Sequence, residues 1–349
     1  MPTLADALGT LAALRLSPRI VTTRDLVQAC VDVRDWADKD GLVHTSLAYA
    51  EAAAALDLDN PILAAQAGKA ARRAGLPDRA ESWYDRAEKS AARKRNRREQ
   101  IRALLGHGSL MRETGRYQEA RELIGRASQL AASTRRNRQA AESSHDLLAI
   151  AIEDGSYDEC EMYVLAALRT YPIHHPSVPR LVHDWSFYLV CRSLYLQAVP
   201  LLVGIIPEAR RAELQMLYQG TLARAAAGAG RRELYDRAVQ AVVTLSGVHQ
   251  EFAAAALANS AEGARFFRDW DRAEGFAARA VEIAAQRGEA DVQRGALAIL
   301  DAVATRTLPE PQALPPSGSK IESITRRIVA FVQQRQKPPR RPVQTDRDN

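Results

Sequence analysis

The chain has 349 residues, of which 46% are hydrophobic and 26% charged, and its formal net charge is +6. These are ordinary values for a globular protein, and the abundance of Ala, Arg and Leu favours helices over strands. No run of 18 apolar residues could span a membrane, three cysteines are too few for a disulfide framework, and the N-terminus lacks the charged start of a secretory signal. We therefore expect a helical, cytoplasmic protein with no membrane partner.

The N-terminal segment, residues 1–26, is predicted to cap the fold that follows it. Apolar residues recur there at the spacing of one helix face, at Leu4, Leu8 and Leu11. Thr22 and Asp25 then stand three residues apart. This is the spacing of a capping box, in which each side chain bonds the backbone N–H of the other residue, so a new helix is expected to begin there.

Glycines recur along the chain at a nearly constant interval. Gly41, Gly75, Gly115 and Gly155 are separated by 34, 40 and 40 residues, and apolar residues at helical spacing flank each of them. This arrangement predicts a turn between two helices, repeated along the chain. Small residues around each turn would let neighbouring helices approach closely. The small residues of the second, third and fourth units are Gly68, Gly75, Ala80 and Ala87; Gly108, Gly115, Ala120 and Ala127; and Gly155, Cys160 and Ala167, with Leu148 at the first position of the fourth unit.

This pattern resembles the tetratricopeptide repeat, over residues 27–306. The resemblance implies an all-α, right-handed superhelical solenoid of about seven helical hairpins, with capping helices at the two ends. Several units run to 37–40 residues rather than 34, so a hairpin repeat of the HEAT type stays an alternative. Solenoids of either kind commonly bind extended protein segments on their concave surface.

The C-terminal part divides into three segments. Residues 307–319 are rich in proline and are predicted to be a linker. Residues 320–336 form an amphipathic pattern that predicts a helix, which either folds back as a cap on the solenoid or docks on another chain to form a homo-oligomer. Residues 337–349 are basic and too polar to pack, so we expect them to be disordered.

The repeat register also assigns the residues that face the concave groove. In the resemblance, the first helix of each hairpin lines this groove, and its inward positions are mainly basic in the second and third units. We therefore expect a protein or peptide partner with an acidic segment. The Lys/Asn clamp of chaperone-binding family members is not matched, because Lys69 and Ser109 stand at the corresponding Asn positions. The predicted groove residues are Lys69, Arg72, Arg102, Arg112, Glu142, His145, Arg180 and His183.

Positive charge is concentrated in the middle of the chain. Residues 89–138 hold 14 Lys or Arg and 4 Asp or Glu. Two clusters between repeats lie about 40 residues apart, so stacked hairpins would place them on one edge as a basic ridge. Such a ridge could bind an acidic protein or nucleic-acid phosphates, or it could simply keep the surface soluble. The ridge comprises Arg93, Lys94, Arg95, Arg97, Arg98, Arg135, Arg136 and Arg138.

Two His-Asp pairs are the strongest hint of chemistry. His145-Asp146 and His183-Asp184 stand 38 residues apart at matching places in adjacent units. Such pairs can bind a metal or transfer protons, but their repetition with the solenoid period favours a packing feature. Phosphate-binding and zinc-protease motifs do not occur. We predict no catalytic residue, metal or cofactor, and a non-enzymatic scaffold or adaptor; a regulatory protein that associates with nucleic acid through the ridge and tail is the alternative.

Overall fold

The computed structural model describes residues 4–16, 19–313 and 319–336, and this part of the chain forms seventeen α-helices and one short 3-10 helix, without a strand. None of these helices is long and apolar enough to cross a membrane. In chain order they are α1 (Leu4–Leu16), α2 (Thr23–Lys39), α3 (Val43–Leu56), α4 (Pro61–Arg73), α5 (Pro77–Arg93), α6 (Arg97–Glu113), α7 (Tyr117–Ser133), α8 (Asn137–Glu153), α9 (Tyr157–Thr170), α10 (Val178–Cys191), α11 (Tyr195–Ile205), η1 (Ile206–Glu208), α12 (Ala212–Gly228), α13 (Arg232–Ser246), α14 (Ala253–Phe266), α15 (Trp270–Arg287), α16 (Ala290–Ala304) and α17 (Lys320–Gln336).

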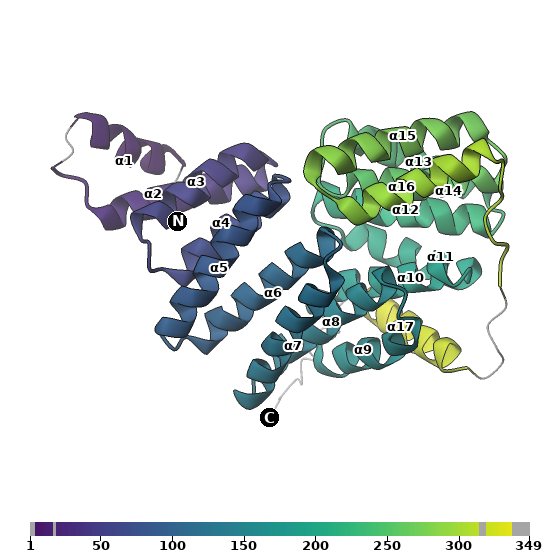
Figure 1. Ribbon diagram of the computed structural model, residues 1–349, viewed down its shortest axis with the longest axis horizontal. Helices are drawn as coiled ribbons and strands as arrows, with labels where there is room; N and C mark the ends of the chain where they lie inside the picture. Colours follow the sequence, from purple (N-terminus) through teal and green to yellow (C-terminus); the bar gives the residue numbers. More distant parts are fainter. Residues whose placement is uncertain (1–3, 17–18, 314–318, 337–349) are drawn as a thin grey trace, which may run out of the picture.

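Consecutive helices pack against each other along most of this length, and they pair into seven hairpins that begin with α2–α3 and end with α14–α15 (Figure 1). Helix α1 packs on α2 before the first hairpin, and α16 packs on α14 and α15 after the last one. The predicted all-α solenoid of seven tetratricopeptide-like hairpins is therefore confirmed.

The turns explain why glycine marks the repeat. Gly75, Gly115 and Gly155 have φ values of 73°, 76° and 82°, inside hairpins at the places predicted from their spacing. This left-handed backbone is easily adopted by glycine because it has no Cβ. The turns between hairpins use the same conformation without glycine: Arg95 and Arg135 each have a φ of 53°. In the hairpins α4–α5 and α6–α7, glycine thus occupies the turn inside the hairpin but not the turn that follows it.

Small residues hold neighbouring helices together, as the repeat pattern predicted. Ala80, Ala87, Ala120 and Ala127 are fully buried. At Gly108 a Cβ atom would lie 2.6 Å from Cγ1 of Ile124, so any larger residue would push α6 and α7 apart. The second half of the solenoid is filled differently, because its largest fully buried side chains are aromatic: Trp185, Tyr188, Tyr195, Tyr218 and Tyr235.

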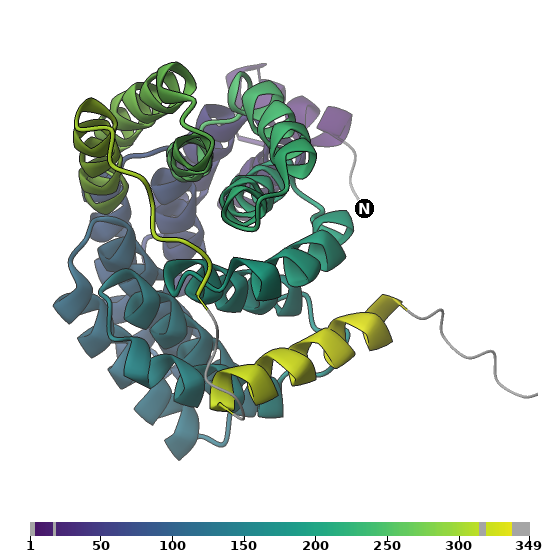
Figure 2. The same ribbon diagram turned by 90° about the vertical axis from the view of Figure 1, so that its right-hand side faces the viewer.

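The hairpins wind so far around the superhelix axis that the chain meets itself (Figure 2). The turn between α15 and α16 lies against the turn between α4 and α5, where the Arg287 guanidinium donates a hydrogen bond to the backbone oxygen of Arg73 over 3.1 Å. Arg73 itself reaches three carboxylates, those of Asp38 on α2, Glu213 on α12 and Glu251 just before α14. We call these five residues the closing seam.

Both terminal helices pack on the solenoid. The capping box predicted at Thr22 and Asp25 is present at the start of α2. Helix α17 packs on α9 and α11 in the middle of the solenoid, and it buries Ile324, Ile328 and Val332. The division of the chain into a cap, solenoid, linker, C-terminal helix and tail stays a prediction. Residues 314–318 of the predicted linker and the predicted tail at 337–349 lie outside the described residues.

Candidate binding channel inside the superhelix

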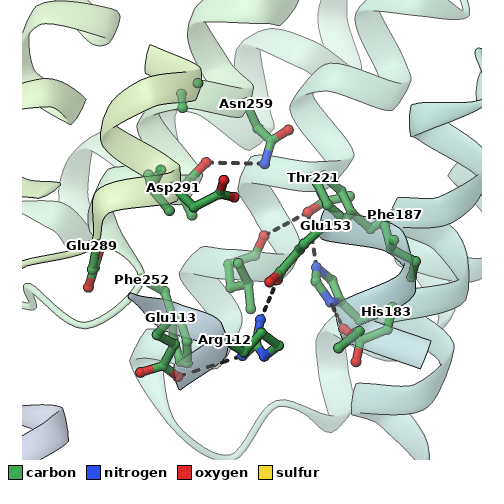
Figure 3. Close-up of a pocket in the computed structure, with 18 of the residues that line it drawn as sticks. Arg112, Glu113, Glu153, His183, Phe187, Thr221, Phe252, Asn259, Glu289 and Asp291 are labelled. Atoms are coloured by element: carbon green, nitrogen blue, oxygen red, sulfur yellow. Dashed lines mark hydrogen bonds and ion pairs between the residues drawn. The ribbon is translucent and has the colours of Figure 1, made fainter. Parts of the chain in front are cut away.

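Three adjoining cavities follow the inside of the superhelix. The inner cavity has a volume of about 300 Å³ and lies between α6, α8, α10, α12, α14 and α16 (Figure 3). A connecting cavity of about 230 Å³ shares Arg72, Arg112 and Arg180 with it. An outer cavity of about 540 Å³ lies between α6, α8 and α10 and shares Arg180 with both. Together they form a channel along the concave face, which we call the inner channel.

All eight predicted groove residues line this channel. Arg72, Arg112, Arg180 and His183 line the inner cavity. The outer cavity is lined by Lys69, Arg102, Glu142 and His145, together with Arg180. They come together because the first helices of successive hairpins stack with the same face inward. That these residues bind a partner stays a prediction.

Ion pairs between neighbouring hairpins cross the channel wall. Arg72 on α4 pairs with Glu113 on α6, and Arg112 on α6 pairs with Glu153 on α8. The two pairs repeat with the period of the hairpins, since each joins residues 41 positions apart. They neutralise much of the positive charge that the sequence places in the groove. Burial raises the pKa of Glu153 to about 7, although Arg112 opposes that rise.

Asp184 on α10 joins the two histidines that the sequence singled out. Its carboxylate lies 2.9 Å from Nε2 of His145 and 2.9 Å from Nδ1 of His183, while Nε2 of His183 lies 3.0 Å from the Thr221 hydroxyl. Burial by itself would raise the pKa of Asp184, but Arg180 and the two histidines hold it well below its usual range. Both nitrogens of the His183 ring are therefore engaged inside the protein. Among the described residues no group of three His, Cys, Asp or Glu side chains is placed to hold a metal ion.

An apolar wall lies beside these charges. The ring of Phe252 packs under the guanidinium of Arg180 at 5.5 Å, and Phe187 faces the inner cavity one turn after His183. Apolar side chains in a cavity with a few polar groups are typical of ligand sites. The sequence analysis did not select these positions, which are Ile152, Phe187, Leu217, Phe252, Val292 and Ile299.

The predicted basic ridge lies away from the channel, in the turns that join α5 to α6 and α7 to α8 and at the helix ends beside them. These turns are at the same ends of adjacent hairpins. All eight side chains are exposed except that of Arg136, which is partly buried. Several of them pair with carboxylates: Arg93 with Asp59 at 2.7 Å and Arg138 with Glu142 at 3.1 Å. The functional role of the ridge stays a prediction.

Comparison with known proteins gives a fold likeness only. No protein-family model and no curated protein matches the chain. A solved structure of a Podosopora anserina putative kinesin light chain with nearly identical TPR-like repeats is 19% identical, and the match covers 52% of this chain and 93% of that one with a TM-score of 0.39. The TPR domain of P58(IPK) is 12% identical over 89% of this chain and 99% of that one, with a TM-score of 0.26.

Proposed function

We propose that this protein is a non-enzymatic scaffold or adaptor that holds an extended segment of a protein or peptide partner in the inner channel. The observation that carries the proposal is that the three cavities adjoin and share lining residues, and that this lining combines paired charges with an apolar wall. An extended chain suits such a row of cavities, because its side chains can enter them one at a time. Apolar contacts would then supply affinity, and the charged groups would select the partner.

The same proposal includes a preference for an acidic segment at the outer cavity. Lys69 and Arg102 are exposed there. Arg102 bonds Glu99 at 3.0 Å, but 47% of its side chain stays accessible to a partner. Carboxylates passing this opening would be attracted over a distance of about 8–10 Å at physiological salt. The partner should therefore bind faster at low ionic strength.

The test fills the channel without disturbing the fold. Gly295 on α16 lines the inner cavity, and a Cβ atom there would meet nothing within 4 Å. Gly295→Phe should fit and block the channel. Gly275→Phe on α15 is the matched control, because that glycine is equally open but does not line the cavity.

The measurement is affinity capture from the native host with wild-type protein and both variants, followed by mass spectrometry. A partner retained by wild type and Gly275→Phe but lost from Gly295→Phe is the expected result. Equal retention by all three proteins would contradict the channel as the binding site.

A nucleic-acid partner is the second candidate, because the ridge keeps seven exposed cationic side chains on turns at the same ends of adjacent hairpins. Nuclease treatment during the same capture distinguishes the two. Partners released by nuclease, together with a steep loss of affinity with salt, would favour the ridge. Partners that survive nuclease but not Gly295→Phe favour the channel.

A further inference from the structure

Six arginines line the inner cavity, and five of them hold a carboxylate of the protein itself. Arg73 bonds Glu251 at 2.8 Å, Arg180 bonds Asp184 at 3.3 Å and Arg287 bonds Glu289 at 2.6 Å. The remaining two pairs join Arg72 to Glu113 and Arg112 to Glu153. A carboxylate for each guanidinium is therefore the rule on this surface, as expected where charges are shielded from water.

Arg224 on α12 is the exception. Among the described residues, its guanidinium makes no hydrogen bond and no ion pair that joins it to a carboxylate, and its Nε atom is buried without a partner. The side chain is partly buried and lines the same cavity as Phe187, Thr221 and Asn259. A donor shielded from water in this way costs free energy unless something accepts its hydrogen bonds.

The neighbouring hairpin shows why Arg224 is left without a partner. The interval of 41 residues that joins Arg72 to Glu113 and Arg112 to Glu153 leads from Arg224 to Arg265, which is no carboxylate. Glu262 on α14 is the carboxylate whose charge acts most on Arg224 and favours a raised pKa, but no direct hydrogen bond or ion pair joins the two side chains. Its carboxylate is instead engaged by Arg265, one turn along the same helix. Arg265 is held in place because it also donates to the backbone oxygen of Thr307 over 2.7 Å.

The surroundings of Arg224 limit what could bind there. The planar guanidinium can hold a carboxylate through two parallel hydrogen bonds. A phosphate carries a charge of about −1.5 to −2, and the carboxylate of Glu262 in the same cavity would repel it more strongly than a group with a single charge. The apolar wall at Phe187 and Ile299 suits a hydrocarbon body.

We propose that Arg224 is the anion subsite of the inner cavity and receives one carboxylate of the bound segment, whose apolar part lies against Phe187 and Ile299. This inference rests on the proposed function of the channel. The carboxylate belongs either to an Asp or Glu side chain or to the C-terminus of the segment. The two sources share the chemistry that Arg224 recognises.

The first test needs no natural partner. Hexanoate is the probe, 1-hexanol is its uncharged match, and binding is measured by calorimetry on the full chain. We expect hexanoate to bind wild type at least about tenfold more tightly than Arg224→Met, as for the loss of one charge-assisted hydrogen bond. Hexanol should not distinguish the two proteins. Arg169→Met, at an exposed position on α9, is the control and should behave as wild type.

A folding measurement distinguishes a binding role of Arg224 from a structural one. Arg224 has no hydrogen-bonded counter-ion, and burial and the charge of Glu262 act on its pKa in opposite directions, so Arg224→Met should leave helicity unchanged and the Tm close to that of wild type. A large fall in Tm would show that Arg224 stabilises the fold through contacts of its own, and it would overturn the subsite. Equal affinity of wild type and Arg224→Met for hexanoate would overturn it as well.

The second test uses two pools of octapeptides. One pool has free C-termini and lacks Asp and Glu; the other has amidated C-termini and contains Glu. Retention of either pool by wild type but not by Arg224→Met supports the subsite and identifies the source of the carboxylate. Retention of a pool by both wild type and Arg224→Met overturns Arg224 as the anion subsite but not the inner channel as the binding site. If hexanoate binds through Arg224 but neither pool is retained, the subsite stands and the proposed peptide function fails.

Discussion

Two kinds of seam hold this solenoid together, and they differ in the contact that dominates each. Where one hairpin meets the next, the helices pack closely through small and apolar residues, beside the ion pairs of the channel wall: a Cβ atom at Gly220 on α12 would lie 2.5 Å from Cα of Ala256 on α14. Where the superhelix meets itself, the closing seam consists of ion pairs around Arg73, whose side chain is only 4% exposed. Packed backbones cannot separate without losing the fold, whereas an ion pair can exchange its partner for water. The hairpin seams therefore define the fold, and the closing seam sets how far the superhelix is open.

The largest effect should come from breaking a hairpin seam. In Gly220→Leu the new side chain would overlap the backbone of α14, so we expect a loss of about 3 kcal/mol or more in the free energy of unfolding. Urea denaturation followed by circular dichroism measures it. Gly275→Leu, where nothing lies within 4 Å, should change stability little and serves as the control. Similar stabilities of the two variants would show that α12 and α14 do not depend on this close approach.

An intermediate effect is expected at the closing seam. Arg73→Met leaves the carboxylates of Glu213 and Glu251 without this partner. Removing one member of a buried ion pair typically costs about 3–5 kcal/mol, and opening the seam should reduce the loss to about 2 kcal/mol because water then reaches the carboxylates.

The distinctive result for Arg73→Met is a change of shape. Small-angle scattering should show a larger radius of gyration with the helix content unchanged. Arg79→Met removes an ion pair with Glu51 in which the arginine side chain is 56% exposed, and it should leave the radius as in wild type. An unchanged radius in Arg73→Met would mean that other contacts close the superhelix.

The smallest effect concerns protonation, to which the apolar seams do not respond. Burial raises the pKa of Asp146, beside the outer cavity, to about 6. Between about pH 4 and 6 the folded chain keeps this proton and the unfolded chain loses it, so stability falls as pH rises through that window. Asp146→Asn should remove this part of the pH dependence. A rise of about 2 in the pKa corresponds to about 3 kcal/mol, which the partial exposure of the side chain reduces, so the variant should be more stable than wild type at pH 7.5 by roughly 1–2 kcal/mol.

Thermal unfolding of wild type and Asp146→Asn at a series of pH values measures the difference. Asp158→Asn, at an exposed position on α9, is the control and should follow the wild-type curve. Parallel curves for Asp146→Asn and wild type would show that Asp146 is not shielded from water.

Local signals in the sequence predict local structure well. The glycine spacing identifies the turns at Gly75, Gly115 and Gly155, because glycine adopts the left-handed backbone there without the steric cost that other residues bear. Of the three later hairpins, the one formed by α12 and α13 has glycine in its turn, Gly230 with a φ of 72°, whereas Ser193 and Arg268 adopt φ values of 56° and 57° with ordinary side chains. The repeat register also assigns inward positions, because stacked hairpins keep one face inward.

Long-range features of the structure cannot be predicted from such local patterns. The closing seam joins Arg73 to Glu251 across 178 residues, and its formation depends on the accumulated curvature of all the hairpins between them. The carboxylates of Glu113 and Glu153 were within reach of sequence analysis, because they follow Arg72 and Arg112 by the same interval of 41 residues. The same interval leads from Arg224 to Arg265, so the missing carboxylate was within reach as well, whereas the ion pair between Arg265 and Glu262 was not.

The position of α17 has a consequence for the order in which the molecule matures on the ribosome. Trp185 on α10 is fully buried, and its indole N–H donates over 3.0 Å to the hydroxyl of Thr325, which is synthesised 140 residues later. The N-terminal hairpins can assemble as they emerge. The apolar surface of α9 and α11 that α17 covers stays exposed to solvent until α17 has been synthesised. Nascent chains paused before Lys320 should therefore recruit chaperones at α9–α11 rather than at their growing end.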